Sequence, residues 1–197
     1  MSINGFVNVL KPPGMTSHDV VSYMRRIYKT KKIGHAGTLD PAAAGVLPIA
    51  IGYATRLLEY ITDVDKSYRA EVLLGLSTDT DDYTGKVLKH ESFSMPLETD
   101  IKNILTEFCG EITQVPPIYS AIKIDGHKAY DLARKSIAVD IPPRLIKIHD
   151  ISLLQCSDDS FRIDVHCSKG TYIRTLCADI GKKLQIPAVM GDRKSVV

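Results

Sequence analysis

The chain has 197 residues, enough for one large domain or two small ones with a buried core. Its hydrophobic fraction of 44% and charged fraction of 24% are typical of a soluble globular protein. No apolar run approaches the roughly 20 residues that cross a bilayer, and the N-terminus lacks the basic and apolar regions of a signal peptide. We therefore expect a cytoplasmic protein that has no membrane partner.

Positive charge is concentrated near the two ends of the chain, although the net charge is only +2. Residues 1–75 carry nine Lys and Arg against six Asp and Glu, residues 76–125 carry four against nine, and residues 126–197 carry twelve against eight. Five cations stand shortly before Asp40: Arg25, Arg26, Lys29, Lys31 and Lys32. Such a run is either a solvated helix face or a phosphate-binding rim beside the loop that follows it.

The first half of the chain predicts alternating strands and helices. A strand over 6–10 stops at a Lys-Pro-Pro-Gly turn, and a helix capped by Thr16 or Ser17 runs to about residue 28. The apolar stripe of this helix is Val20, Val21, Met24 and Ile27. An apolar segment over 46–51, a short helix over 54–61 and a half-buried strand over 67–76 follow.

The second half predicts a helix over 97–108, a chain break over 114–117 and a strand over 118–124. A helix over 128–135, two antiparallel strands over 145–154 and 161–167, and a last helix that Gly170 opens and that runs to about residue 184 complete the chain. Strands and helices mix without a regular strand–helix–strand alternation. This pattern favours an α+β fold.

Several classes of chemistry lose support from absent motifs. The chain has no nucleotide-binding P-loop, no dinucleotide fingerprint and no G-x-S-x-G nucleophile elbow. The acidic turn over 78–85 fails the calcium-loop template, because Tyr83 and His90 stand where ligands are required. The cysteines form no C-x-x-C pair and no zinc spacing with histidine, so we expect free, buried thiols at Cys109, Cys156, Cys167 and Cys177.

The segment over 34–48 says most about function. It holds one acid, Asp40, among three glycines and two prolines. Pro41 fixes its own φ and pushes Asp40 toward extended backbone, so the loop presents a carboxylate on a stiff segment with little side-chain bulk. A capping aspartate in a Gly/Pro turn would have the same local sequence.

Three other segments could act with Asp40. Tyr68, on a predicted strand, is either a stacking platform for a base or a core tyrosine. Residues 116–123 couple a rigid turn to a predicted strand that carries a tyrosine and a lysine. The segment is either part of a site or simply the buried start of a strand. Arg174 stands in the first turns of a helix, where the dipole disfavours a cation. It therefore needs a carboxylate or phosphate partner unless it is a solvated surface residue.

Taken together and in this order, five blocks resemble the TruB family of tRNA pseudouridine-55 synthases over nearly the whole length. The blocks are residues 5–12 with Gly14 and Ser17, residues 34–48, residues 66–70 with 74–85, residues 114–123 with Gly126 and Tyr130, and residues 170–174 with Leu176, Asp179 and Gly181. A single G-T-L-D-P motif would be weak evidence, whereas five ordered blocks are strong evidence.

The resemblance implies a pseudouridine synthase fold with a mixed, largely antiparallel central sheet flanked by helices. It also implies isomerisation of uridine 55 in the TΨC arm of tRNA, without a cofactor or metal. Asp40 matches the essential aspartate, Arg174 the arginine that pairs with it, and Tyr68 the tyrosine that stacks on the flipped base. Whether Asp40 attacks C1′, adds to the base or steadies a glycal stays open.

The resemblance also suggests RNA contacts, and the candidates are His35, Lys11, Tyr172, Lys31 and Lys32. His35 matches the histidine that occupies the space vacated by the flipped base. Lys11, with Pro12, matches a segment packed beneath the active loop, for which we expect a structural role. The expected partner is the T-arm stem-loop, bound by a monomer.

The resemblance ends near residue 190. Family members continue with a leucine- and arginine-rich segment and a small RNA-binding PUA domain, whereas residues 190–197 depart from that pattern. We therefore expect a catalytic domain over 1–190 and an atypical tail over 191–197, with the PUA domain absent.

Two other functions compete with this interpretation. A non-catalytic tRNA-binding protein or RNA chaperone fits the modest net charge, but binding an anion needs no carboxylate at Asp40. A uracil-releasing glycosylase requires a second acid to activate water, and no residue can be assigned that role.

Overall fold

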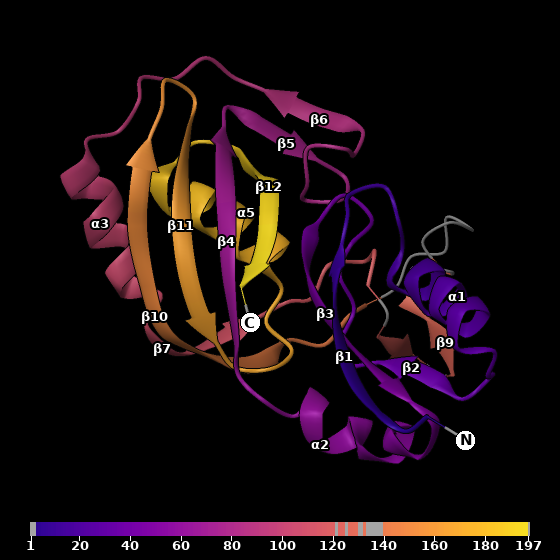
Figure 1. Ribbon diagram of the computed structural model, residues 1–197. Coiled ribbons are helices and arrows are strands. Elements are labelled where there is room, and N and C mark those ends of the chain that lie inside the picture. The colour runs from indigo at the N-terminus through magenta and orange to yellow at the C-terminus, as the bar shows by residue number, and fades with distance from the viewer. Residues whose placement is uncertain (1–2, 121, 125, 130–131, 133–139, 197) are drawn as a thin grey trace. The chain divides into compact units, whose positions relative to one another are not determined.

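The computed structural model describes residues 3–120, 122–124, 126–129, 132 and 140–196 (Figure 1). The chain separates into two compact units, one made of Met1–Arg69 with Asp192–Val197 and the other of Ala70–Gly191. Helices and strands occur together in the way that the expected α+β class requires. Along the described residues, no helix combines the length and the apolar character needed to cross a membrane.

The first unit is a small sheet covered by one helix (Figure 1). Its central strand β3 (Ala44–Ile51) pairs antiparallel with β1 (Gly5–Lys11) and with β2 (Ile33–His35). The 3₁₀ helix η1 (Gly52–Leu57) and the helix α2 (Leu58–Thr62) follow β3. Helix α1 (Ser17–Tyr28) packs on the strands, and the shared core contains Val20, Val21, Met24, Ile33, Leu39, Ala43, Leu47, Ile49 and Ile51.

Helix α1 begins and ends as its sequence predicts. Thr16 accepts a hydrogen bond from the Asp19 amide, and the Asp19 carboxylate accepts one from the Thr16 amide, which forms a capping box. The Thr16 hydroxyl also donates to this carboxylate, and these hydrogen bonds lower the pKa of Asp19. The predicted stripe is wrong at one position, because Ile27 is 55% exposed while the other three residues are buried.

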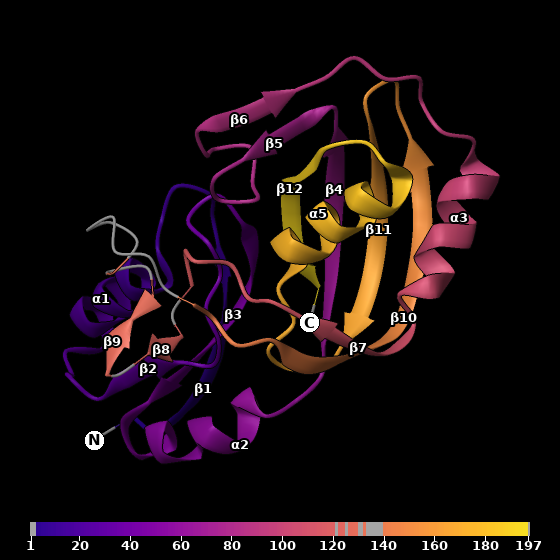
Figure 2. The ribbon, with the colours of Figure 1, turned by 180° about the vertical axis from the view of Figure 1, so that it is seen from behind.

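The second unit is built on a sheet whose strands follow the order β12, β4, β11, β10, β7. Their bounds are β4 (Lys66–Leu74), β7 (Gly110–Gln114), β10 (Arg144–Cys156), β11 (Ser160–Cys167) and β12 (Ala188–Val196). Figure 2 shows helix α5 (Ile173–Leu184) across one face of these strands and helix α3 (Glu98–Glu107) beside β10. Two hairpins pair β5 (Leu76–Thr78) with β6 (Val87–His90) and β8 (Lys123–Ile124) with β9 (His127–Lys128).

Strands β4 and β12 run across the boundary between the units. Strand β4 begins in the first unit, and β12 ends there. In that last part of β12, Lys194 and Ser195 pair in parallel with Ala44 and Gly45 at the start of β3. Strand β12 thus reaches the segment that follows Asp40, and the expected atypical tail over 191–197 includes a strand through residue 196.

Most predicted elements are confirmed, and the errors have physical causes. The strand predicted over 118–124 shrinks to β8, because the chain after Pro116 and Pro117 turns, with the Ser120 amide donating to the Ile118 carbonyl. The missed strands are β2, β5, β6, β7, β9 and β12. Most of the helix expected over 128–135 lies outside the described residues. All four thiols are free, but Cys109 is exposed and Cys156 half-buried, so burial is confirmed only for the other two.

Helix α5 approaches β12 most closely at Gly181, and we expect Gly181→Ala to destabilise the protein. Alanine is the better helix former by about 0.8–1.0 kcal/mol, so helix propensity alone would stabilise the variant. A Cβ at this position would collide with the Ala188 side chain and lie 2.7 Å from the Ile186 carbonyl oxygen. We expect a net loss of about 1–3 kcal/mol in the free energy of unfolding, measured by urea denaturation. A variant as stable as the parent would contradict this tight packing.

Candidate active site

A buried serine fixes the backbone immediately before Asp40. Ser17, the first residue of α1, is 3% exposed. Its hydroxyl oxygen accepts a hydrogen bond from the Leu39 amide at 2.9 Å and lies 3.3 Å from the Leu39 carbonyl oxygen, to which it donates. The Asp40 carbonyl then accepts from the Ala43 amide at 3.0 Å, which closes a turn. The partly exposed Asp40 therefore stands on backbone that is tied to a helix end.

A buried lysine fixes the backbone immediately after Asp40. Lys11 is 0% exposed, and its ammonium donates to the carbonyl oxygens of Pro12 at 3.0 Å, Met15 at 2.8 Å and Pro41 at 3.3 Å. The Pro41 carbonyl also accepts from the Gly14 amide at 2.8 Å. Complete burial excludes a direct contact of Lys11 with RNA, so its place among the RNA-binding candidates is wrong. Its contacts agree with the structural role also expected for it.

Tyr68 and the loop that leads into Asp40 line one cavity of about 80 Å³ in the first unit. Tyr68 is half-buried on β4, and residues 36–39 of the loop line the same space. The apolar lining is Leu39, Val46, Leu47, Ile61 and Val64, and the polar lining includes Asp65 and Lys66. A planar, partly apolar group with polar edges suits such a lining.

His35 stands where β2 passes into the loop. Its Nδ1 contacts the Gly37 carbonyl and is the donor, because a carbonyl oxygen only accepts. The Ala36 amide donates to the Pro48 carbonyl at 2.9 Å, so the pairing with β3 continues one residue past the strand. His35 is therefore oriented by the loop that carries Asp40.

Arg174 is a buried residue of the second unit, so the alternative of a solvated surface arginine is wrong. It is 7% exposed, and its guanidinium donates to the Thr80 carbonyl at 3.0 Å and to the Tyr119 carbonyl at 2.8 Å. It also lies 3.7 Å from a carboxylate oxygen of Asp82. The prediction that this cation needs an anionic partner is confirmed, and the structure identifies a carboxylate, Asp82.

Asp82 belongs to the matched segment over 74–85, and no role was predicted for it. Its Oδ1 accepts from the Thr80 hydroxyl at 3.0 Å, the Thr84 amide at 3.0 Å and the Thr84 hydroxyl at 2.6 Å. Its Oδ2 is the oxygen that lies near Arg174. The alternation of Thr and Asp over 78–82 was the available signal, since such residues bond to nearby backbone in turns.

The backbone at the start of helix α5 is held by a side-chain amide, which donates one hydrogen bond and accepts another as a paired strand would. Buried Gln114, at the end of β7, accepts from the Tyr172 amide at 2.8 Å and donates to the Tyr172 carbonyl at 3.0 Å. Tyr172 itself is half-buried and packs against Ile122, Ala129 and Ile141. This contact fixes the helix two residues before Arg174. A contact of Tyr172 with RNA stays a prediction.

Lys31 and Lys32 are exposed and stand just before the segment over 34–48. The Lys32 carbonyl accepts from the Gly52 amide at 2.8 Å, which places the Lys32 backbone at the end of β3. Asp40 precedes the beginning of the same strand, and seven residue steps of a strand, or about 23 Å, separate the two ends. The backbone of these lysines therefore lies about the length of β3 from Asp40, and their contact with RNA stays a prediction.

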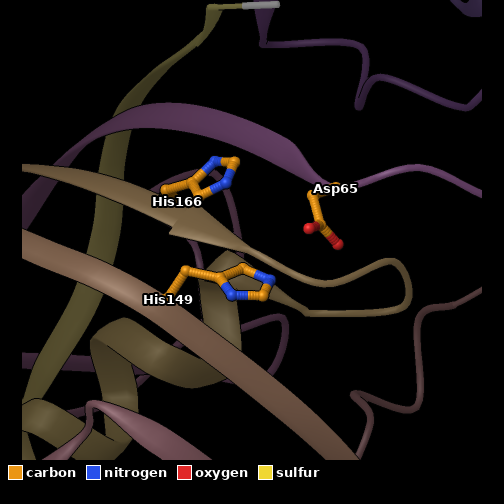
Figure 3. A group of neighbouring side chains, drawn as sticks. All are labelled: Asp65, His149 and His166. Atoms are coloured by element: carbon orange, nitrogen blue, oxygen red, sulfur yellow. The ribbon is translucent and has the colours of Figure 1, made fainter.

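Figure 3 draws two histidines from neighbouring strands of the second unit, His149 on β10 and His166 on β11. Their ring centroids are 5.0 Å apart and their planes are inclined by 39°. Asp65, the third side chain labelled there, belongs to the first unit and lines the cavity of Tyr68. The sequence analysis gave none of these residues a role.

The predicted catalytic residues thus fall into two groups. Asp40, Tyr68 and His35 belong to the first unit, where His35 and Asp40 flank the loop residues 36–39 that line the cavity with Tyr68. Arg174 belongs to the second unit, with Asp82 and the carbonyls that hold it. The pairing of Arg174 with Asp40 stays a prediction.

Comparison with known proteins places this arrangement in context. The sequence profile described as "TruB family pseudouridylate synthase (N terminal domain)" matches residues 25–173. The chain is 51% identical over 193 residues to tRNA pseudouridine synthase B of Caldanaerobacter subterraneus subsp. tengcongensis, covering 96% of this chain and 67% of that protein. It is 52% identical over 192 residues to the protein of the same name from Moorella thermoacetica, covering 95% of this chain and 63% of that protein. The chain spans only about two thirds of the length of these relatives.

Solved structures give a concordant result. The "Crystal Structure of a Cbf5-Nop10-Gar1 Complex" contains a chain that matches with a TM-score of 0.77 and 32% identity, over 98% of this chain and 48% of that one. The "Structure of H/ACA RNP bound to a substrate RNA containing 2'-deoxyuridine" contains one that matches with a TM-score of 0.72 and 30% identity, over 98% and 47%. Both matches extend over nearly all of the chain.

Replacing the buried arginine by lysine should destabilise the second unit. In Arg174→Lys the charge is kept, but one ammonium replaces a planar fork whose nitrogens reach two carbonyls in different segments. A buried carbonyl left without a donor costs about 1–3 kcal/mol, and we expect a loss of that size in urea denaturation. Lys147→Gln, which changes an exposed cation of β10 in the same unit, is the control and should leave stability unchanged. Equal stability of Arg174→Lys and the parent would show that the fork is dispensable.

Asp81, next to the Arg174 partner, should make stability depend on pH. Burial raises the pKa of its carboxyl above the ordinary 3.8, against the opposing effect of Lys182 and Arg174. The ionised form is therefore disfavoured in the folded protein, and its penalty appears as pH rises above the unfolded pKa and through the folded one. Asp81→Asn keeps a side chain that tolerates the φ of 57° and removes this penalty.

The expected result is a stability gain for Asp81→Asn at pH 7 that shrinks toward zero below about pH 4. Urea midpoints of variant and parent, taken across this range, measure the difference. Asp158→Asn, in an exposed turn, is the matched control and should show no such trend. A gain that is the same at every pH would contradict the ionisation argument.

Proposed function

We propose that this chain, which belongs to the TruB family of pseudouridylate synthases, converts a uridine of tRNA to pseudouridine. Its matched relatives are named tRNA pseudouridine synthase B. A similar solved structure is described as bound to a substrate RNA containing 2′-deoxyuridine. The α+β, pseudouridine synthase fold expected from the sequence is confirmed. We propose uridine 55 of the TΨC arm as the target and the T-arm stem-loop as the part that is bound.

The observation that carries this proposal is the cavity shared by Tyr68 and the Asp40 loop. An aromatic ring and apolar side chains in one small space suit a nucleobase, and a carboxylate on the adjoining loop suits the sugar that bears it. A base in an RNA stem-loop must leave its stack to enter such a space, at a cost of a few kcal/mol. His35, on the same loop, is the proposed occupant of the place that the base leaves.

Asp40 is the proposed catalytic carboxylate. Breaking the glycosidic bond develops oxocarbenium-like charge at C1′, and a carboxylate held nearby stabilises or traps it. A glycosidase adds a second acid for the leaving oxygen, but here the uracil stays bound, turns and reattaches through C5, so one carboxylate suffices. Attack on C1′, addition to the base and a glycal route all begin from this position.

The other groups have supporting roles in the proposal. Tyr68 stacks on the flipped base, and Arg174 pairs with Asp40 when RNA is bound. Lys31, Lys32 and Tyr172 contact RNA. We propose that no cofactor or metal takes part, that the protein acts as a monomer, and that it works in the cytoplasm on tRNA.

A tRNA-binding protein without catalysis is the rival function, and Asp40→Asn separates the two. The amide keeps the size and shape of the side chain and loses the charged oxygen. We expect pseudouridine formation on an unmodified tRNA transcript to be abolished, with the dissociation constant for tRNA changed by no more than a few-fold. A single-turnover assay with saturating enzyme measures the first quantity and filter binding the second.

Glu59→Gln is the matched control, because it changes an exposed carboxylate of α2 in the same unit to an amide. It should form pseudouridine at the parental rate. If Asp40→Asn kept more than about a tenth of the parental rate, a barrier change below about 1.4 kcal/mol, the role of Asp40 would be wrong. If the parent itself formed no pseudouridine but bound tRNA, the rival function would replace the proposal.

A further inference from the structure

Two exposed histidines lie next to each other on neighbouring strands of the second unit (Figure 3). His149 belongs to β10 and His166 to β11, and their ring centroids are 5.0 Å apart. One ring nitrogen of each residue lies within 4.8 Å of the other. We call these two residues the histidine pair. Imidazole is the commonest metal ligand in proteins, so two exposed rings at this separation are candidate ligands for one ion.

A bulge in β10 determines what surrounds the histidine pair. Ile148 pairs with Cys167, but the next pair joins Asp150 to His166, so His149 is an extra residue in β10. In such a bulge two residues of one strand stand opposite a single residue of the other. Here the two are His149 and Asp150, and both are exposed, which interrupts the alternation of buried and exposed residues along β10. The bulge therefore brings two imidazoles and a carboxylate to one exposed place on the strand pair.

The spacing of the histidine pair suits a metal ion with short bonds to nitrogen. Zn²⁺ binds imidazole at about 2.0–2.1 Å with tetrahedral geometry, which puts two ligand nitrogens about 3.3 Å apart. The nitrogens of the pair are at most 4.8 Å apart. The outer torsion of a histidine side chain is broad, so a small turn of two exposed rings closes the difference. The backbone does not have to move.

The ligand atoms select the class of ion. Imidazole nitrogen suits Zn²⁺, Cu²⁺ and Ni²⁺, whereas Mg²⁺ and Ca²⁺ take oxygen ligands. Neutral imidazoles do not balance the charge of a divalent cation, but the Asp150 carboxylate opposite His166 supplies a negative charge nearby.

We propose that His149 and His166 bind a late first-row divalent metal ion, that Asp150 stabilises its charge, and that water completes the coordination. The site uses residues of the second unit alone. This inference does not rest on the proposed function, in which no metal takes part.

A bound ion would join β10 and β11 at the point where their ladder is interrupted. The extra residue of a bulge has no partner in the ladder. An ion that takes one ligand from each strand acts as a cross-link there. Because an ion that binds only the folded protein stabilises it, we expect the resistance of the protein to urea to rise with metal concentration.

The test compares the untagged parent with His149→Gln, His166→Gln and His90→Gln. Glutamine stays polar and removes the imidazole. His90 is an exposed histidine of β6 in the same unit, so His90→Gln is the matched control. Each protein is first freed of metal with EDTA and dialysed, and calorimetric titration with Zn²⁺ then gives its affinity. Zn²⁺ bound elsewhere, for example by the exposed thiol of Cys109, is common to all four proteins and cancels in the comparison.

We expect the parent and His90→Gln to bind Zn²⁺ alike, and each variant of the histidine pair to bind it at least roughly tenfold more weakly. Asp150→Asn should weaken binding by a smaller factor, about fivefold, because it removes a nearby charge and not a ligand. Millimolar Mg²⁺ should not compete. Zn²⁺ should raise the urea midpoint of the parent and leave that of the pair variants unchanged, while all midpoints coincide without metal.

Cu²⁺ allows the bound imidazoles to be counted, because electron spin-echo envelope modulation detects the ring nitrogens of each imidazole that coordinates it. We expect two imidazoles on Cu²⁺ in the parent and in His90→Gln, and one in each pair variant. Equal Zn²⁺ affinity of the parent and both pair variants would overturn the proposal, and so would displacement of Zn²⁺ by Mg²⁺. A parent spectrum with one imidazole or none would overturn it as well, and this result needs no variant to fold. Equal affinity of Asp150→Asn and the parent would overturn the part assigned to Asp150.

Discussion

The interaction on which the first unit depends is the burial of the Lys11 ammonium beneath the Asp40 loop. A buried charge is expensive unless its hydrogen bonds are satisfied, and here three backbone carbonyls accept from it. Two of these carbonyls belong to the turn that follows β1, and the third belongs to Pro41. The charge therefore ties a strand end to the residue after Asp40, while Ser17 ties a helix start to the residue before it. The backbone on both sides of Asp40, the proposed catalytic residue, is thus held by two buried side chains.

Whether the sequence predicts a structural feature depends on how far apart along the chain the interacting residues stand. The helix cap at Thr16, the antiparallel strands β10 and β11 and the stiff Asp40 loop are local, and their residue types predicted them, although not the capping box that Asp19 completes. The partners of Lys11 and Arg174 are not local. Arg174 meets carbonyls 94 and 55 residues away, and no periodicity encodes such a contact. The strand predicted over 118–124 was wrong for a related reason. Its apolar run suggests a strand, but the preceding prolines and a turn at Ser120 prevent one.

The exposed cations of the two units differ in the side chains that they contact. In the second unit, Lys89, Lys102 and Lys183 face carboxylates, and such exposed pairs contribute little to stability. Around η1 and the end of α1, the cations stack on tyrosine rings instead, as Arg26 does on Tyr23 at 5.3 Å. A stacked cation keeps most of its field directed outward because the ring carries no net charge. The numbers of basic and acidic residues in each segment agree with this contrast. They do not establish it, because a count cannot tell whether a given lysine contacts a carboxylate or a ring.

Arg174 is a proposed site residue that is buried within its own unit. Thr80, Tyr119 and Asp82 already orient its guanidinium, so under the proposed function this position need not be created on binding of RNA. Donors that are fixed in advance stabilise developing charge better than donors that must reorganise. The same contacts explain a sequence feature that looked unfavourable, a cation in the first turn of a helix. The dipole penalty at such a buried position is at most about 2 kcal/mol, and two charge-assisted hydrogen bonds at roughly 1.5–3 kcal/mol each outweigh it.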